Sequence, residues 1–121
     1  MVLCWVGIPS FSKFDRFEGA GADDNAFVWL GFRPALLIIK SVDSTSSWLI
    51  FDHKREGYNV DNDALVIEAT TAEATTDMVD LLSNGFKVRD TTDPGVAETY
   101  VYLAWAEFPF GGDGVAQARA R

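Results

Sequence analysis

The sequence predicts an all-β fold, an antiparallel β-sandwich of about eight strands and of the jelly-roll or lectin-like kind. The apolar residues fall into short runs rich in β-branched and aromatic side chains, and turn-forming residues separate those runs. The one stretch where a helical turn competes, Thr70 to Thr76, lacks the apolar stripe of a packed helix and is interpreted as a loop. With 121 residues, 48% of them apolar, the chain can form one core. We expect a sandwich domain over residues 1–107 and an extended C-terminal arm over residues 108–121.

The first half of the chain supplies four expected strands. The segment Phe11–Glu18 precedes a loop of glycine and short polar residues, Gly19–Asn25. Phe27–Phe32 should stop at the following Arg-Pro pair, because proline cannot donate to a ladder hydrogen bond. Ala35–Lys40 is apolar at successive positions, so we expect a central strand covered on both faces. Trp48–Phe51 should return as its hairpin partner.

The second half supplies the remaining strands. Ala64–Ile67 is short, and the polar stretch before it indicates a turn. Asp77–Leu82 and Phe86–Arg89 flank Asn84-Gly85, and an Asn-Gly pair between two strand-like runs predicts a hairpin, since both residues tolerate positive φ. Glu98–Glu107 is expected to be the longest strand.

This last strand has two different faces. One face carries the bulkier apolar set, and the other carries the tyrosines and alanines: Val101, Leu103 and Trp105 against Tyr100, Tyr102, Ala104 and Ala106. We expect the bulkier set to face the core. The glycine-rich residues that follow have no partner pattern, so the chain should leave the sandwich as an arm.

Charge and composition argue against several classes of function. The net charge of −8 argues against nucleic-acid binding, because a basic patch is needed to hold phosphates. One cysteine and one histidine provide no zinc site and no intrachain disulfide, and Cys4 is interpreted as a small apolar residue of an N-terminal strand. The apolar run Ala35–Ile39 is far too short for membrane insertion, and the first residues do not resemble a signal peptide.

No set of residues predicts catalysis or a cofactor. His53 lies in a charged, turn-rich segment and is interpreted as a solvated loop residue, and no nucleophile elbow is present. Asp23-Asp24-Asn25 and Asp61-Asn62-Asp63 offer oxygen atoms that calcium prefers, but neither follows the calcium-loop pattern, and turn formation explains both clusters. We therefore expect no enzyme activity and no bound metal.

Four aromatic residues raise the question of a sugar-stacking platform: Trp29, Trp48, Tyr58 and Trp105. The three tryptophans lie in or beside strand-like runs, so core packing is the better interpretation. Tyr58 lies in a loop and is the one we expect to be free for binding. The loops around Asp23, Asp24, Tyr58 and Asn59 are the candidate ligand-facing loops.

Four motifs of the chain together carry a resemblance: Gly7–Phe14, Gly31–Ala35, the Leu-Ser-Asn-Gly-Phe-Lys run of 82–87 and the Ala-Glu-Phe-Pro-Phe-Gly-Gly run of 106–112. They resemble an uncharacterised domain that is common in tailed-bacteriophage structural proteins. This resemblance covers nearly the whole chain and implies a virion component without known catalytic residues. Two features depart from it: the chain begins just before the domain, without a long N-terminal part, and the loop 19–25 is more acidic.

Two functions remain open at this point. The first is a non-enzymatic virion structural protein, made in the host cytoplasm and acting as a tail-fibre, tail-associated or capsid-decoration subunit. It would form a homo-oligomer, a trimer by analogy, and would contact other phage structural proteins through an assembly arm containing Phe108, Phe110, Arg119 and Arg121. The alternative is a lectin-like tail module that recognises a glycan of the host surface through its loops.

Overall fold

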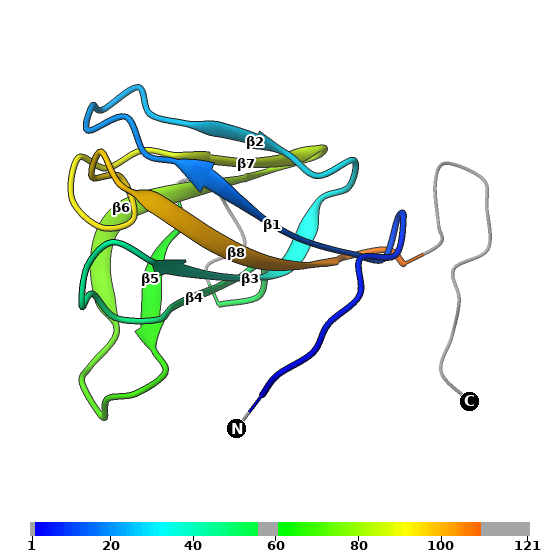
Figure 1. The fold of residues 1–121 in the computed structure, drawn as a ribbon, viewed down its shortest axis with the longest axis horizontal. Coiled ribbons are helices and arrows are strands. Elements are labelled where there is room, and N and C mark those ends of the chain that lie inside the picture. Colours follow the sequence, from blue (N-terminus) through cyan, green and yellow to red (C-terminus); the bar gives the residue numbers. More distant parts are fainter. Residues whose placement is uncertain (1, 56–60, 110–121) are drawn as a thin grey trace.

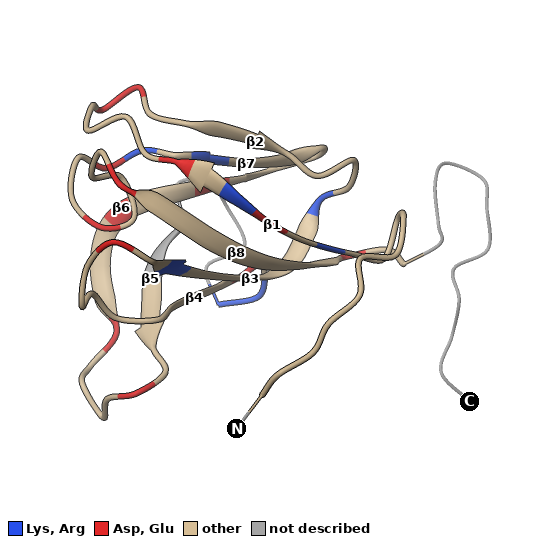
Figure 2. Cartoon of the chain, in the orientation of Figure 1, with Lys and Arg blue, Asp and Glu red and all other residues tan. Residues whose placement is uncertain are grey.

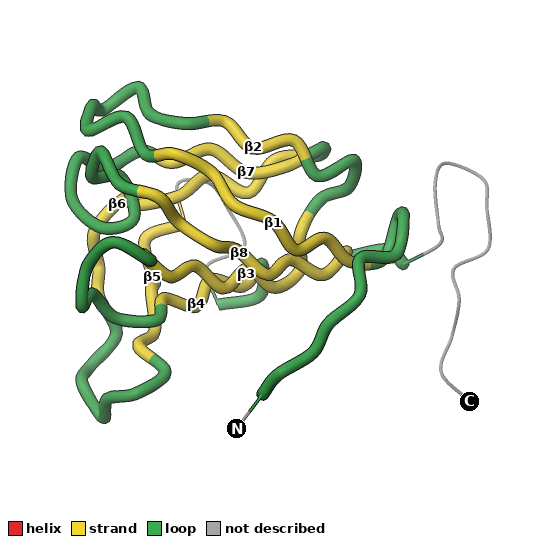
Figure 3. The backbone as a smooth tube through the Cα atoms, viewed as in Figure 1, coloured by secondary structure: helices red, strands yellow, loops and turns green. Residues whose placement is uncertain are grey.

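The computed structural model describes residues 2–55 and 61–109, and in that part of the chain it contains eight strands and no helix (Figures 1 and 3). The strands are β1 (Ser12–Glu18), β2 (Phe27–Trp29), β3 (Pro34–Ser41), β4 (Leu49–Asp52), β5 (Asp61–Val66), β6 (Ala74–Leu82), β7 (Gly85–Val88) and β8 (Thr99–Ala106). These residues accordingly hold no helix that could cross a bilayer.

All strand pairs are antiparallel, and together they form one continuous sheet in the order β1-β8-β3-β4-β5-β6-β7-β2. The sheet folds back on itself at β5, which pairs with β4 on one side and with β6 on the other, so that two layers enclose the core (Figure 1). The first strand pairs with the last and the second with the seventh, a nested arrangement also found in jelly rolls. The predicted all-β sandwich of about eight strands is confirmed.

Aromatic rings fill the centre of the core. Phe17 stacks on Tyr100 with ring centroids 5.2 Å apart, and Phe86 meets Tyr102 edge-on at 5.5 Å. The buried face of β8 is therefore the one that carries the tyrosines and alanines, and the prediction that Val101, Leu103 and Trp105 face the core was wrong. The tyrosines supply large rings for packing. The hydroxyl of Tyr100 has a hydrogen-bond partner in the fold, because it donates a hydrogen bond of 2.8 Å to Asp93.

Several strand limits differ from the predicted ones. β2 ends at Trp29 rather than at Phe32, because Gly31 turns the chain with a φ of 83° and the N–H groups of Leu30 and Gly31 donate to the carbonyl of Asn84. β5 begins at Asp61, in the stretch interpreted as a turn, and β6 begins at Ala74, inside the stretch Thr70–Thr76 interpreted as a loop. With nine residues, β6 is also longer than β8. Cys4 lies exposed outside any strand, not in an N-terminal strand.

The predicted hairpin between β6 and β7 is confirmed, but for a different reason. Leu82 pairs with Gly85, so the two turn residues are Ser83 and Asn84, and neither Asn84 nor Gly85 adopts a positive φ. Gly85 is required instead by a close approach of backbones: a Cβ added there would lie 2.1 Å from the carbonyl oxygen of Val28 on β2. The glycine thus allows β2 to pair with β7.

The strand β3 is internal to the sheet, with β4 pairing as its expected hairpin partner. Its residues alternate, however: Leu37 and Ile39 are buried, whereas Leu36 and Ile38 are only half-buried. The expectation that both faces are covered was wrong within the described residues. An apolar face of the sheet is left open there.

Candidate functional site

A continuous apolar row crosses the open face of the sheet. The register aligns Phe14 with Leu103, Leu103 with Ile38, Ile38 with Ile50, and Ile50 with Leu65, so five neighbouring strands each contribute one side chain. Trp105 pairs with Leu36 in the adjacent row, next to Phe14 at a ring distance of 5.3 Å. We call this set the apolar row.

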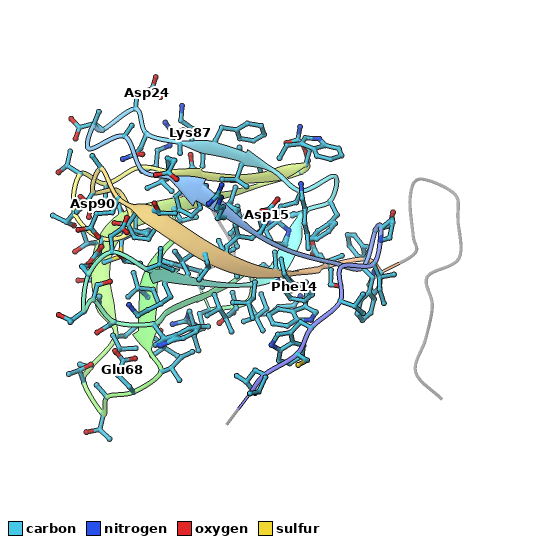
Figure 4. The ribbon with its side chains drawn as sticks, in the orientation of Figure 1. Phe14, Asp15, Asp24, Glu68, Lys87 and Asp90 are labelled. Carbon is cyan, nitrogen blue, oxygen red and sulfur yellow. The ribbon has the colours of Figure 1, made fainter. Side chains whose placement is uncertain are left out.

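The N-terminal segment extends the same surface. Trp5 packs against Phe14 and Trp105, with ring centroids 6.0 and 5.4 Å apart, and Figure 4 shows Phe14 on the side of the sheet where this segment passes. Val2, Leu3 and Val6 remain 63–85% exposed. A contiguous apolar surface of this kind commonly marks a site of interaction.

The charges are balanced on four of the five strands that form this face. Alternation along the paired strands places four charged residues on the open face of β1, β8, β3 and β4, namely Arg16, Lys40, Glu18 and Asp52. They sum to zero, whereas the whole chain carries −8. Figure 2 shows most acidic residues in the loops at the left of the view, outside the apolar row. The open face of these four strands is therefore far less acidic than the molecule as a whole.

The tryptophans do not form the core as predicted. Trp29 is 60% exposed, Trp48 is 36% exposed, and Trp105 lies half-buried on the open face. Trp105 lies on the face of β8 opposite the buried Tyr102 and Ala104, and Trp29 lies on the face of β2 opposite the buried Val28. Trp29 is the most exposed of the three, so it is also the most available to a ligand.

Trp29 borders a pocket of about 460 Å³ at the seam between the two edge strands, β1 and β2. Lys13 of β1 donates a hydrogen bond of 2.7 Å to the carbonyl of Trp29, and its ammonium lies 4.9 Å from the centre of the indole ring. The ring rests over Gly31, where an added Cβ would come within 3.0 Å of the indole Cη2 atom. These contacts hold an exposed indole in one orientation.

A second pocket of about 320 Å³ adjoins the first, and the two share Ser10, Gly31 and Phe32 as lining residues. Arg33 and Glu107 line this second pocket, with the guanidinium Nε 3.5 Å from a carboxylate oxygen of Glu107. That Nε atom and Oε2 of Glu107 are buried and lack a hydrogen bond. We call the two pockets together the seam groove.

His53 contacts Glu107, which lines the second pocket, and is not the solvated loop residue that the sequence predicts. Its side chain is 14% exposed, its Nδ1 lies 3.1 Å from the carbonyl of Ala35, and its Nε2 lies 3.6 Å from Glu107. Because β3 and the residues after β4 are neighbours in the sheet, the histidine is brought against the end of β8, a contact that local composition does not reveal.

The acidic loop at Asp23 and Asp24 is tied down by the protein itself. Asp24 forms an ion pair with Lys87, whose hydrogen bond and charge lower the pKa of the Asp24 carboxyl, and Figure 4 shows the two side chains near each other. The amide oxygen of Asn25 accepts hydrogen bonds from the backbone N–H groups of Ala20 and Ala26. These contacts join the loop to Lys87 of β7 and close its own turn.

The remaining sequence-predicted residues are only partly placed. Phe108 is 51% exposed and lines the second pocket, whereas Tyr58, Asn59, Phe110, Arg119 and Arg121 lie outside the described residues. The side chains of Asp61, Asn62 and Asp63 are likewise outside the description. Within residues 2–55 and 61–109, no group of three or more His, Cys, Asp and Glu side chains is arranged to hold a metal ion.

Comparison with known proteins identifies the family. Residues 1–109 match a family described as a domain of unknown function, DUF7483. The chain belongs to this family. No curated protein and no solved structure matches the chain significantly.

Sequence reasoning missed the two surfaces that stand out in this DUF7483 domain. The apolar row depends on the register of five strands, which the sequence alone does not specify. The seam groove depends on the meeting of the sheet edges β1 and β2. One signal was available: Phe27 and Trp29 alternate with Val28, so a reading of this strand as half-buried would have placed both aromatic rings on one exposed face.

Proposed function

We propose that this chain is a non-enzymatic structural subunit of a bacteriophage virion, an appendage or decoration subunit that assembles with copies of itself. The resemblance of several motifs to a domain of tailed-phage structural proteins supports the virion context. The partner proposed for the open face of the sheet is a second copy of the chain. The proposal assigns no catalytic role to any residue and no role to a cofactor.

The observation that carries this proposal is the apolar row from Phe14 to Leu65. Monomeric soluble proteins rarely leave a large contiguous apolar patch in water, and covering it with another protein removes that surface from solvent. With Trp5, Trp105 and Leu36 beside it, the row offers the aromatic and aliphatic side chains that dominate stable interfaces.

The charge distribution favours a second copy as the occupant. Two molecules of net charge −8 repel each other if their acidic loops meet. On β1, β8, β3 and β4 the open face avoids this problem, because the two positive and two negative residues of these strands cancel and the apolar row itself is uncharged. Most soluble homo-oligomers are closed and symmetric, and three copies is the number suggested by analogy with phage fibres and cement proteins.

The assembly proposal is tested by placing a charge in the row. Ile38→Glu should shift the protein from oligomer to monomer in sedimentation velocity, because a carboxylate cannot be buried unpaired in an apolar interface. The free energy of unfolding should change by only about 1 kcal/mol, since Ile38 is half-buried in the single chain. Phe27→Glu alters an exposed aromatic residue on the other layer and is the matched control, expected to leave the oligomer intact. Equal behaviour of the two variants would remove the row as the interface.

The virion context needs a separate measurement. Mass spectrometry of purified phage particles from the host that carries the gene should find this chain among the particle proteins. Particles grown with the Ile38→Glu gene should contain much less of it. Finding the wild-type chain only in the unassembled cell fraction would contradict the virion proposal.

A further inference from the structure

We infer that the seam groove is a binding site for a saccharide chain, with Trp29 as the ring on which one sugar stacks. This inference does not depend on the self-assembly proposal, because the groove and the apolar row use different residues. It also differs from the loop sites at Asp24 and Tyr58 that the sequence favours for a glycan.

The groove has the dimensions of a ligand site. Its two parts, about 460 and 320 Å³, meet at Ser10, Gly31 and Phe32. Small-molecule sites in proteins usually measure about 300–1,000 Å³. Since the two parts are adjacent and both reach the surface, an elongated ligand can occupy them together.

The aromatic surface is positioned before any ligand arrives. Trp29 is 60% exposed but is held by the ammonium of Lys13 and by the absence of a side chain at Gly31. An exposed indole without such contacts would exchange among rotamers and lose conformational entropy on binding. Phe32 in the shared section and Phe108, 51% exposed in the second pocket, extend the apolar surface along the groove.

The polar groups suit hydroxyl-rich ligands. The hydroxyl of Ser10 and the ion pair of Arg33 with Glu107 supply donors and acceptors beside the aromatic surface. Because Arg33 Nε and Glu107 Oε2 lack hydrogen bonds, a small movement of the pair would let neighbouring sugar hydroxyls satisfy them. Apolar ring faces combined with fixed donors and acceptors match the two faces of a pyranose ring, which has C–H groups on one side and hydroxyls around its rim.

Backbone strain marks the same place. Ser10 has a φ of 62° and is the one non-glycine residue at positive φ in the described part of the chain. It lies in the tight turn after Pro9, closed by the hydrogen bond from Phe11 N–H to the carbonyl of Ile8. A non-glycine residue at such a φ costs about 1–2 kcal/mol, and strain of this kind concentrates at binding sites.

The test uses the full chain against defined saccharides. The probes are an array of bacterial O-antigen and capsular oligosaccharides, with chitohexaose as a neutral and an oligogalacturonate as an acidic reference. Isothermal titration calorimetry then measures affinity for any saccharide that the array identifies. Neutral and acidic binders both support the inference, and preference for the acidic probe would assign the charge contact to Lys13 and Arg33.

Three variants localise the site. Trp29→Ala should weaken binding by about tenfold or more, as the loss of a central anchor does. Gly31→Ala should also weaken binding, because the added methyl group displaces the indole ring of Trp29 from its position although the ring itself is still present. Phe27→Ala, two residues away on the same face of β2 but outside the groove, should leave affinity within about twofold.

Three binding results would overturn the inference. Failure of the folded wild-type chain to bind any probe overturns it, as does unchanged affinity in Trp29→Ala or an equal loss in Phe27→Ala. Strand addition by an extended peptide at the open edges of β1 and β2, without saccharide binding, would assign the groove to a protein partner instead. Ile38→Glu should keep full saccharide binding, which separates this result from the fate of the assembly proposal.

Discussion

At the scale of single residues, the aromatic side chains divide into a set buried in the core and a set exposed on the surface. The buried positions hold Tyr100, Tyr102, Phe17 and Phe86, while Trp29 is exposed. Composition and strand alternation could predict that aromatic rings build the core, but not which ones, because the choice depends on a partner such as Asp93, seven residues before Tyr100. The contacts of loop residues could not be predicted either, because their hydrogen bonds connect distant parts of the chain.

Asn25 is the polar residue that joins two loops at one end of the sandwich. Its side-chain N–H groups donate to the carbonyls of Asp90 and Gly95, at 3.0 and 2.7 Å, in addition to the two bonds that its oxygen accepts. Asn25→Ala should lower the free energy of unfolding by about 2–4 kcal/mol, because buried backbone groups lose their partners. Urea unfolding measures this loss, and the exposed Asn84→Ala is the control, with an expected change within about 0.5 kcal/mol. A loss as small for Asn25 as for Asn84 would contradict this role.

The two buried tyrosines make stability depend on alkaline pH. Burial, helped by the carboxylate of Asp15, raises the pKa of Tyr102 to about 12, and burial together with the hydrogen bond to Asp93 raises the pKa of Tyr100 as well. An unfolded tyrosine has a pKa of about 10, so the folded chain holds these protons more tightly. The resulting stabilisation is complete below about pH 10 and is lost as the pH rises toward 12 and above.

Urea unfolding between about pH 9 and pH 12 should therefore show a falling free energy of unfolding. Tyr102→Phe removes one of the two groups and should make that fall less steep. Absorbance of tyrosinate should rise late in the titration of the folded protein. The same pH dependence in wild type and variant would show that Tyr102 is not responsible.

At the scale of elements, the existence of most strands could be predicted from the sequence, whereas their ends and register could not. The β6–β7 hairpin was predicted from Asn84-Gly85, although the glycine acts through a close approach to Val28 rather than through positive φ. Strand β2 stops early because Gly31 turns the chain toward Asn84, a contact between segments more than fifty residues apart. Contacts of this range follow from the fold and leave no local pattern.

Gly85 provides a test of how β2 is held in the sheet. Gly85→Ala would place a methyl group 2.1 Å from the carbonyl oxygen of Val28, so one of the two strands must move. We expect a loss of about 2–3 kcal/mol in the free energy of unfolding, together with faster amide exchange along β2. Gly7→Ala is the matched control, because its added Cβ would lie 3.7 Å from its nearest neighbour, an ordinary contact. Slow exchange of β2 amides in Gly85→Ala would contradict the account.

At the scale of the whole molecule, the sandwich leaves two surfaces that its own folding does not use. The apolar row lies on the open face of β1, β8, β3, β4 and β5, and the seam groove lies where the edge strands β1 and β2 meet. The predicted sandwich was right, yet both surfaces escaped prediction, because each combines residues from distant strands. The predicted sites, in contrast, were loops and an arm chosen for their composition, and Asp24 is engaged by Lys87.

The central claim is that a second copy covers the apolar row, and side-chain reactivity tests it most directly. Ile38→Cys in a Cys4→Ser background carries a single thiol at the middle of the row, and Phe27→Cys in the same background carries one on the exposed face of β2. At high protein concentration, the thiol at position 38 should react with a small reagent much more slowly than the thiol at position 27, and dilution to monomer should speed its reaction. A thiol at position 38 that reacts at the same rate at every concentration would contradict the claim.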